Sequence, residues 1–184
     1  MNSNTLTQLV TYDDYRHLPD DGKQYQIIEG ELYMTPAPST VHQRIARNIF
    51  VILYNHITEH DLGEVFFAPV DIIFTMTDVV QPDILFIAKQ RLNIITKKNV
   101  VAAPDLAVEI LSESTQHLDR EKKKDLYLRQ KVKEYWIVDP EARSVEQFIQ
   151  SSDKYKHSLY SGNNTFTSPV VDGLAVTVND IFEG

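Results

Sequence analysis

The segment that most constrains the fold of this chain runs from residue 103 to residue 140, APDLAVEILSESTQHLDREKKKDLYLRQKVKEYWIVDP. Residues 105–111 are apolar almost throughout, a proline precedes them, and Ser112 begins a polar turn. A short apolar run between such boundaries is typical of a strand that is covered on both faces. A segment with helical character follows, and residues 134–139 (EYWIVD) predict a second strand. The segment therefore predicts a strand, a turn, a helix and a strand.

Glu109 is the residue of this segment that points to a functional site. A carboxylate in the middle of an apolar strand is costly to bury unless a positive charge meets it. Three lysines at positions 122–124 lie on the predicted helix that follows. Residues 79–87 predict another apolar strand, and this strand carries Asp83 directly after Pro82. Two acids on strands and a lysine on a helix together predict a site.

These residues resemble the PD-(D/E)XK nuclease superfamily and, more narrowly, the Uma-type family of predicted restriction endonucleases. The resemblance covers most of the chain. Its matching pieces are residues 28–32 (IEGEL), His42, residues 82–84 (PDI), residues 104–112 (PDLAVEILS), Asp119, Arg120, Lys123, Tyr127 and residues 134–139 (EYWIVD). The superfamily pattern would place a lysine at position 111, where this chain has Leu111. The resemblance implies that Lys123 on the helix takes the place of that lysine.

The resemblance implies hydrolysis of DNA with Mg²⁺ or Mn²⁺ as the cofactor. This reaction needs an activated water and stabilisation of the charge that develops on the phosphate oxygens, and a hard divalent ion with oxygen ligands supplies both. We expect Asp83, Glu109 and the main-chain carbonyl of Ile110 to be the metal ligands. Lys123 is expected to orient the water or to contact the phosphate. Asp119, Lys123 and Tyr127 follow one another at four-residue spacing and share one stripe of the predicted helix.

Two further residues are candidates for an accessory role in this site. Glu31 follows a predicted glycine turn, and the resemblance hints that it supplies an extra acid. His42 lies at the start of a predicted helix, where a surface position is the alternative to a ligand role.

Each of the three main candidates also has a purely structural interpretation. Asp83 could cap a turn after Pro82, and Glu109 could face water. Lys123 could pair with Asp119 across a helical turn, which contributes only a few tenths of a kcal/mol. We interpret residues 134–136, including the single tryptophan, as structural.

The composition is that of an ordinary globular protein of 184 residues, with 42% hydrophobic and 24% charged residues. We expect one domain over residues 1–184. No window is long and apolar enough to span a membrane, and the first residues lack a secretion signal. The absence of cysteine excludes disulfides and thiolate metal sites but fits several compartments, and we expect the default, a cytoplasmic protein. The net charge of −8 argues against non-specific binding of nucleic acid. Residues 119–133, however, carry seven Lys or Arg, which form either a solvated helix face or a surface for the phosphate backbone.

The expected fold is a mixed α/β domain of the restriction-endonuclease type. A mixed central sheet carries Asp83 and Glu109, and helices near residues 41–60 and 117–130 flank it. A short helix from Thr11 and a hairpin over residues 24–34 precede these elements, and residues 93–101 form a connector. Antiparallel strands near residues 144–149 and 155–160 extend or cap the sheet, and residues 174–178 form a last strand.

The sequence therefore predicts a metal-dependent endonuclease that acts on DNA, and we expect a homodimer because cutting two strands often takes two sites. Two alternatives belong to other functional classes. One is a catalytically silent nuclease-like scaffold that binds DNA or a protein partner. The other is a metal-dependent hydrolase of a different phosphate ester.

Overall fold

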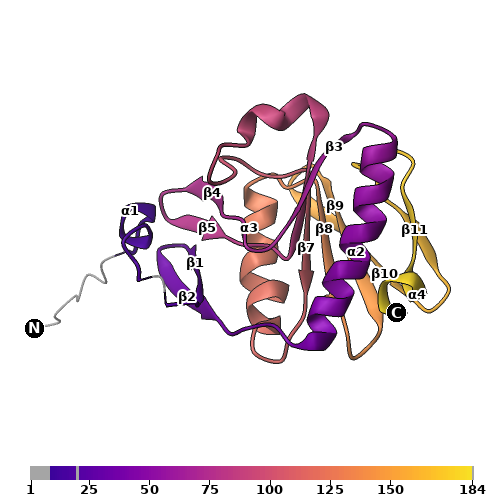
Figure 1. The fold of residues 1–184 in the computed structure, drawn as a ribbon, viewed down its shortest axis with the longest axis horizontal. Helices are drawn as coiled ribbons and strands as arrows, with labels where there is room; N and C mark the ends of the chain where they lie inside the picture. The colour runs from indigo at the N-terminus through magenta and orange to yellow at the C-terminus, as the bar shows by residue number, and fades with distance from the viewer. Residues whose placement is uncertain (1–8, 20, 184) are drawn as a thin grey trace, which may run out of the picture.

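The computed structural model describes residues 9–19 and 21–183 (Figure 1). Its helices and strands are, in chain order, α1 (Tyr12–Tyr15), β1 (Gln24–Ile28), β2 (Glu31–Thr35), α2 (Thr40–Glu59), β3 (Gly63–Phe67), β4 (Ile72–Thr75), β5 (Asp78–Val80), β6 (Ile84–Ala88), the 3₁₀ helix η1 (Lys89–Ile94), β7 (Leu106–Ile110), the π-helical segment η2 (Leu118–Lys123), α3 (Lys124–Arg129), β8 (Glu134–Asp139), β9 (Ser144–Ser151), β10 (Lys154–Ser161), β11 (Thr165–Thr167), β12 (Ala175–Thr177) and α4 (Val178–Phe182).

A six-stranded mixed sheet forms the centre of the fold, with strand order β10-β9-β8-β7-β6-β3. Strands β7 and β8 are parallel, as expected for strands joined through a helix, and their neighbours pair antiparallel. The predicted mixed α/β fold is therefore confirmed. The strands after Pro140 extend this sheet, because β9 and β10 add to its edge beside β8.

Helices cover both faces of this sheet, as Figure 1 shows. On one face the core joins apolar residues of α2 and α4 to every second residue of β7 and β8, for example Val108 and Trp136. On the other face the alternate strand residues, such as Ala107 and Tyr135, pack against η2 and α3. Strands β7 and β8 are thus buried on both sides, which explains their continuous apolar sequence.

A smaller antiparallel sheet, with strand order β2-β1-β5-β4, lies beside the central one. Its hairpin β1–β2 turns at Glu29 and Gly30, whose φ angles of 54° and 76° suit a two-residue turn between antiparallel strands. The prediction of one strand over residues 79–87 was wrong, because β5 and β6 belong to different sheets. Pro82 explains the break, since it lacks the N–H that a continuous strand would need.

The remaining predicted elements lie close to their expected places. The helix predicted over residues 117–130 consists of η2 followed by α3, so its first part is wider than an α-helix. The connector predicted over residues 93–101 begins inside η1. The strand predicted over residues 174–178 corresponds to β12, whereas its partner β11 in a two-stranded sheet was not predicted. Among the described residues, no helix is long and apolar enough to cross a membrane.

Candidate functional site

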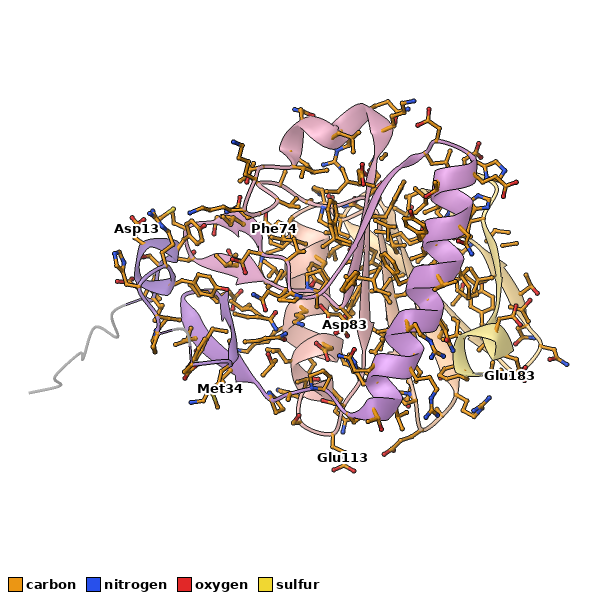
Figure 2. The ribbon with its side chains drawn as sticks, in the orientation of Figure 1. Asp13, Met34, Phe74, Asp83, Glu113 and Glu183 are labelled. Carbon is orange, nitrogen blue, oxygen red and sulfur yellow. The ribbon has the colours of Figure 1, made fainter. Side chains whose placement is uncertain are left out.

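A cavity of about 740 Å³ opens at the edge of the central sheet where β6 begins and β7 ends. Because these strands are antiparallel, the residue before β6 lies beside the last residues of β7. The first turns of α2, the hairpin β1–β2 and the loop after β7 supply the other walls. Figure 2 shows Asp83 in the middle of the molecule, beside α2, with Glu113 near its outer surface. Of the sequence candidates, the structure brings Asp83, Glu109, Ile110, Lys123 and His42 to this cavity.

Asp83 is held in place by contacts from two other elements. Its Oδ2 accepts a hydrogen bond of 2.7 Å from the backbone N–H of Ile110 and lies 3.1 Å from Nε2 of His42. His42 reaches this position because Ser39 caps α2 by accepting a hydrogen bond from the N–H of His42. Asp83 therefore does more than cap a local turn, since it connects β7 to the start of α2.

Glu109 points to the face of the sheet that η2 and α3 cover. Its Oε1 accepts a 2.7 Å hydrogen bond from the hydroxyl of Tyr127 and lies 2.9 Å from Nζ of Lys123. The side chains of Glu109 and Lys123 are 4% and 3% exposed, so the interpretation of Glu109 as a water-facing strand residue was wrong. The strand acid and the helix lysine are therefore in direct contact in the interior of the protein.

Asp119 adds a second buried carboxylate to this pair. Its Oδ1 lies 3.1 Å from Nζ of Lys123, one helical turn away on η2, and its side chain is 2% exposed. Although it lies within ion-pair distance, this oxygen has no hydrogen-bond partner of good geometry. The hydroxyl of Tyr135 donates to the backbone carbonyl of Asp119, which ties η2 to β8. Sequence analysis placed Asp119 on the helix stripe of Lys123 but did not assign it to the site.

Buried polar atoms without hydrogen-bond partners concentrate at this cavity. In the described part of the chain there are four such side-chain atoms, and three of them belong to cavity-lining residues: Nδ1 of His42, Oε1 of Gln81 and Oδ1 of Asp119. Native proteins satisfy most buried polar groups, so unsatisfied ones call for a reason such as a bound ligand. Their position supports this cavity as a binding site. Sequence analysis missed Gln81, although it directly precedes Pro82 and Asp83.

Burial and neighbouring charges shift the pKa values of the central groups. Burial, together with the negative charges of Asp119 and Asp83, raises the pKa of Glu109 to about 8, although Lys123 opposes this shift. Burial alone would lower the pKa of Lys123, but the carboxylates of Asp119 and Glu109 raise it above its usual value. Burial alone would also lower the pKa of His42, but the hydrogen bond and the negative charge of Asp83 raise it above its usual value. Lys123 is therefore an ammonium ion at neutral pH.

The residues of the cavity suit a hard divalent cation. Six carboxylates line it, against the single ammonium of Lys123: Asp83, Glu109, Glu113, Asp119, Asp139 and Glu141. The hydrogen bonds described above use Oδ2 of Asp83 and Oε1 of Glu109, which leaves one oxygen of each for a ligand. Oxygen ligands are those that Mg²⁺ and Mn²⁺ prefer. No cluster of three His, Asp or Glu side chains forms a ready-made metal site within residues 9–19 and 21–183, so a metal here would need main-chain or water ligands as well.

The structure does not bring Glu31 to this site. Its side chain is 63% exposed, lies outside the cavity lining, and pairs with Lys122 at 2.7 Å while it accepts from the hydroxyl of Tyr33. Because the turn at Gly30 directs β2 along the outer surface, Glu31 joins the hairpin to η2 instead of joining Asp83 and Glu109.

The basic residues of segment 119–133 are mostly neutralised. Six of the seven pair with carboxylates: Arg120 with Asp139 and Glu146, Lys122 with Glu31, Lys123 with Glu109 and Asp119, Arg129 with Glu29, Lys131 with Asp153 and Lys133 with Asp105. The segment therefore presents less free positive charge than its sequence suggests.

Comparisons with known proteins show the family of this chain and a structure of similar fold. The model of the Uma2 family, described as "Putative restriction endonuclease", matches residues 12–179. A crystal structure from Anabaena variabilis, described as "a putative nuclease belonging to DUF820", has a similar fold with a TM-score of 0.80. That similarity covers 94% of this chain and 97% of the other at 19% identity. A comparison with curated proteins finds no match.

Proposed function

This chain belongs to the Uma2 family, and we propose that it is a divalent-metal-dependent endonuclease that hydrolyses phosphodiester bonds in DNA. The observation that carries this proposal is the meeting of two strand carboxylates and a buried ammonium in one cavity. Asp83 directly precedes β6, Glu109 lies on the neighbouring strand β7, and Lys123 contacts Glu109 at 2.9 Å. A site of this kind can hold a cation and a phosphate together.

We propose Asp83, Glu109 and the carbonyl of Ile110 as the residues that hold Mg²⁺ or Mn²⁺. When bound, such an ion makes a water nucleophilic at neutral pH and stabilises charge on the phosphate oxygens. The excess of carboxylates in the cavity repels a phosphate in the absence of cations, so the substrate and the metal are expected to bind together.

The protein groups have distinct roles in the proposed reaction. Asp83, fixed by Ile110 and His42, and Glu109, fixed by Tyr127, define where the cation lies. Lys123 donates hydrogen bonds to the phosphate and offsets its growing charge. A water oxygen bonds to phosphorus as the bond to the leaving sugar oxygen breaks. The attacking water loses a proton to solvent and the leaving oxygen gains one, so each cleavage consumes one water.

The direct test is a cleavage assay of the purified protein on supercoiled plasmid and on single-stranded DNA. Each substrate is incubated with Mg²⁺, with Mn²⁺ and with chelator. We expect nicked or linear products with metal and none with chelator. Glu109→Gln, which keeps the shape of the side chain, serves as the matched control. Cleavage that persists in chelator, or in folded Glu109→Gln, would contradict the proposal.

The neutralised basic segment favours a second candidate function, hydrolysis of a smaller phosphate ester. Six of its seven cations are paired with carboxylates, which weakens the attraction for a long polyanion. The same assay with a chromogenic phosphodiester in place of DNA separates the two functions. Turnover of the small ester without cleavage of any DNA would favour this second candidate.

We also propose that the protein acts in the cytoplasm as a homodimer, since cleavage of two strands is served by two sites. Light scattering at the concentration of the cleavage assay tests whether the protein is a homodimer. A monomer that cuts both strands would contradict it.

A further inference from the structure

The ammonium of Lys123 is enclosed by two buried carboxylates from different elements. It lies 2.9 Å from Oε1 of Glu109 on β7 and 3.1 Å from Oδ1 of Asp119 on η2. Once Glu109 is ionised to bind a cation, the cluster holds two carboxylates for one ammonium, and burying the further charge costs free energy. The burial of Asp119 therefore calls for a separate explanation.

The place of Lys123 on a helix gives that explanation. Leu111, two residues beyond Glu109 and directly after β7, belongs to the same apolar core cluster as Leu118 and Leu126. The cation consequently enters the site from η2, on a long and flexible side chain. A single contact with Glu109 would hold Nζ less firmly once the charge of Glu109 is shared with a bound cation.

We propose that Asp119 is the positioning residue of Lys123, and that it holds Nζ in the site when Glu109 binds the divalent cation. This inference rests on the proposed function of the same cavity. The π-helical turn directs Asp119 and Lys123 together toward β7, while the adjacent Lys122 turns outward to Glu31. Tyr135 fixes the turn itself by donating to the backbone carbonyl of Asp119.

The contacts of Glu109 and Asp119 indicate different roles for the two carboxylates. Glu109 already receives the hydroxyl of Tyr127 on the oxygen that faces Lys123, so Glu109 remains oriented if the lysine shifts toward a phosphate. Oδ1 of Asp119 has no hydrogen bond of good geometry, which leaves it free to accept one from Lys123 after a small shift. Asp119 thus keeps its contact with Lys123 while Glu109 binds the cation.

The kinetic test is Asp119→Asn, compared with Asp125→Asn, which removes an exposed carboxylate from the same helical region. We expect Asp119→Asn to lower kcat about 10- to 100-fold with little change in KM, as found for residues that orient catalytic groups. Asp125→Asn should leave kcat unchanged. In a Lys123→Met background, Asp119→Asn should cause little further loss, because the residue acts through the lysine. Equal losses in both backgrounds would mean a merely structural role and would overturn the inference.

A second measurement does not depend on activity. In metal-free protein labelled with ¹⁵N-lysine, the ammonium resonance of Lys123 is identified by its loss in Lys123→Met. We expect slow exchange of its protons with water in the wild type and in Asp125→Asn, and faster exchange in Asp119→Asn. Unchanged exchange in Asp119→Asn would overturn the inference.

Two outcomes separate this inference from the proposed function. A wild type that cleaves nothing would overturn the proposed function, whereas cleavage that Asp119→Asn leaves unaffected would overturn only the role of Asp119. If Asp119→Asn does not fold, Asp119→Glu keeps the charge and displaces it by one methylene. Reduced kcat in folded Asp119→Glu would support positioning, and wild-type kcat would contradict it.

Discussion

Two buried glutamates on neighbouring strands of the same sheet have opposite surroundings. Glu109 on β7 and Glu134 on β8 are 3% and 0% exposed. Glu109 faces η2 and α3, where its partners are an ammonium and a phenol. Glu134 faces the other side, where the indole N–H of Trp136, the amide of Gln147 and the hydroxyl of Ser168 all donate to it. Burial raises the pKa of both carboxyl groups.

The difference shows why burial alone does not identify a functional acid. Every donor to Glu134 is neutral, and together they tie β8 to β9 and to the segment after β11. Glu109 instead shares its pocket with another acid, a lysine and buried atoms that lack hydrogen bonds. A saturated network of neutral donors stabilises the fold, whereas an unsaturated, charged cluster beside a cavity can bind a ligand.

The largest expected effect comes from exchanging each glutamate for its neutral isostere. Glu109→Gln should lower metal-dependent DNA cleavage by about 10²-fold or more, because it removes a carboxylate that binds the catalytic cation. Glu134→Gln should leave the activity of the folded fraction unchanged. It should cost about 1–3 kcal/mol of unfolding free energy, since one of its donors loses an acceptor. Cleavage rates and urea unfolding curves measure both effects. Equal activity losses in the two variants would contradict a site role for Glu109 and a structural role for Glu134.

The next effect concerns two adjacent lysines of η2. Lys123 is buried between carboxylates, whereas Lys122 is partly exposed and pairs with Glu31. Lys123→Met should reduce turnover about 10²-fold and destabilise the fold, because two buried carboxylates lose their cation. Lys122→Met, and likewise Lys124→Met, should only weaken DNA binding and flatten its dependence on salt. Similar kinetics for all three variants would indicate a diffuse basic surface in place of a site lysine.

The sequence predicts those features of the two glutamates and their neighbours that depend on local sequence pattern. The apolar neighbours of Glu109 predict its burial, and the spacing of Asp119, Lys123 and Tyr127 predicts a common helix face. Both expectations are confirmed by the contacts of Glu109 and Lys123. The interpretation of residues 134–136 as structural agrees with the neutral donors around Glu134.

The features that sequence analysis missed depend on contacts between distant segments. Nothing local to Glu31 says that its hairpin lies outside the cavity and that Lys122 meets it there. The seven basic residues of segment 119–133 suggest a charged surface only until their partners from other segments of the chain are placed. The π-helical turn is equally hidden, because its sequence suits an α-helix as well.

The dependence of stability on pH gives a smaller effect that sharpens the comparison. The folded-state pKa of Glu109 is raised from its ordinary value to about 8, so between about pH 4.5 and 8 the folded state binds a proton that the unfolded state has lost. The metal-free wild type should therefore lose stability as the pH rises through this window. Glu109→Gln cannot titrate and should show a flatter profile, as measured by unfolding in chelator at several pH values. Coincident profiles would mean that Lys123 keeps Glu109 ionised throughout.

The smallest expected effect on the metal-free fold comes from Asp83→Asn, which tests whether Asp83 belongs with Glu109 or only supports the backbone. The amide oxygen of the introduced asparagine can still accept the hydrogen bond from Ile110, and the neutral side chain removes a negative charge that opposes ionisation of Glu109. The substitution also removes the charge that pairs with His42. These terms oppose one another, so the stability in chelator should change by less than about 1 kcal/mol. With excess Mg²⁺, the melting temperature of the wild type should rise as the metal site fills. The melting temperature of the variant should not rise, because its site lacks one carboxylate ligand for the metal. Thermal melts of both proteins, in chelator and in Mg²⁺, measure the four values needed. A variant that melts lower in chelator yet still responds to Mg²⁺ would mean that Asp83 resembles Glu134, a carboxylate that supports the fold and does not bind the cation.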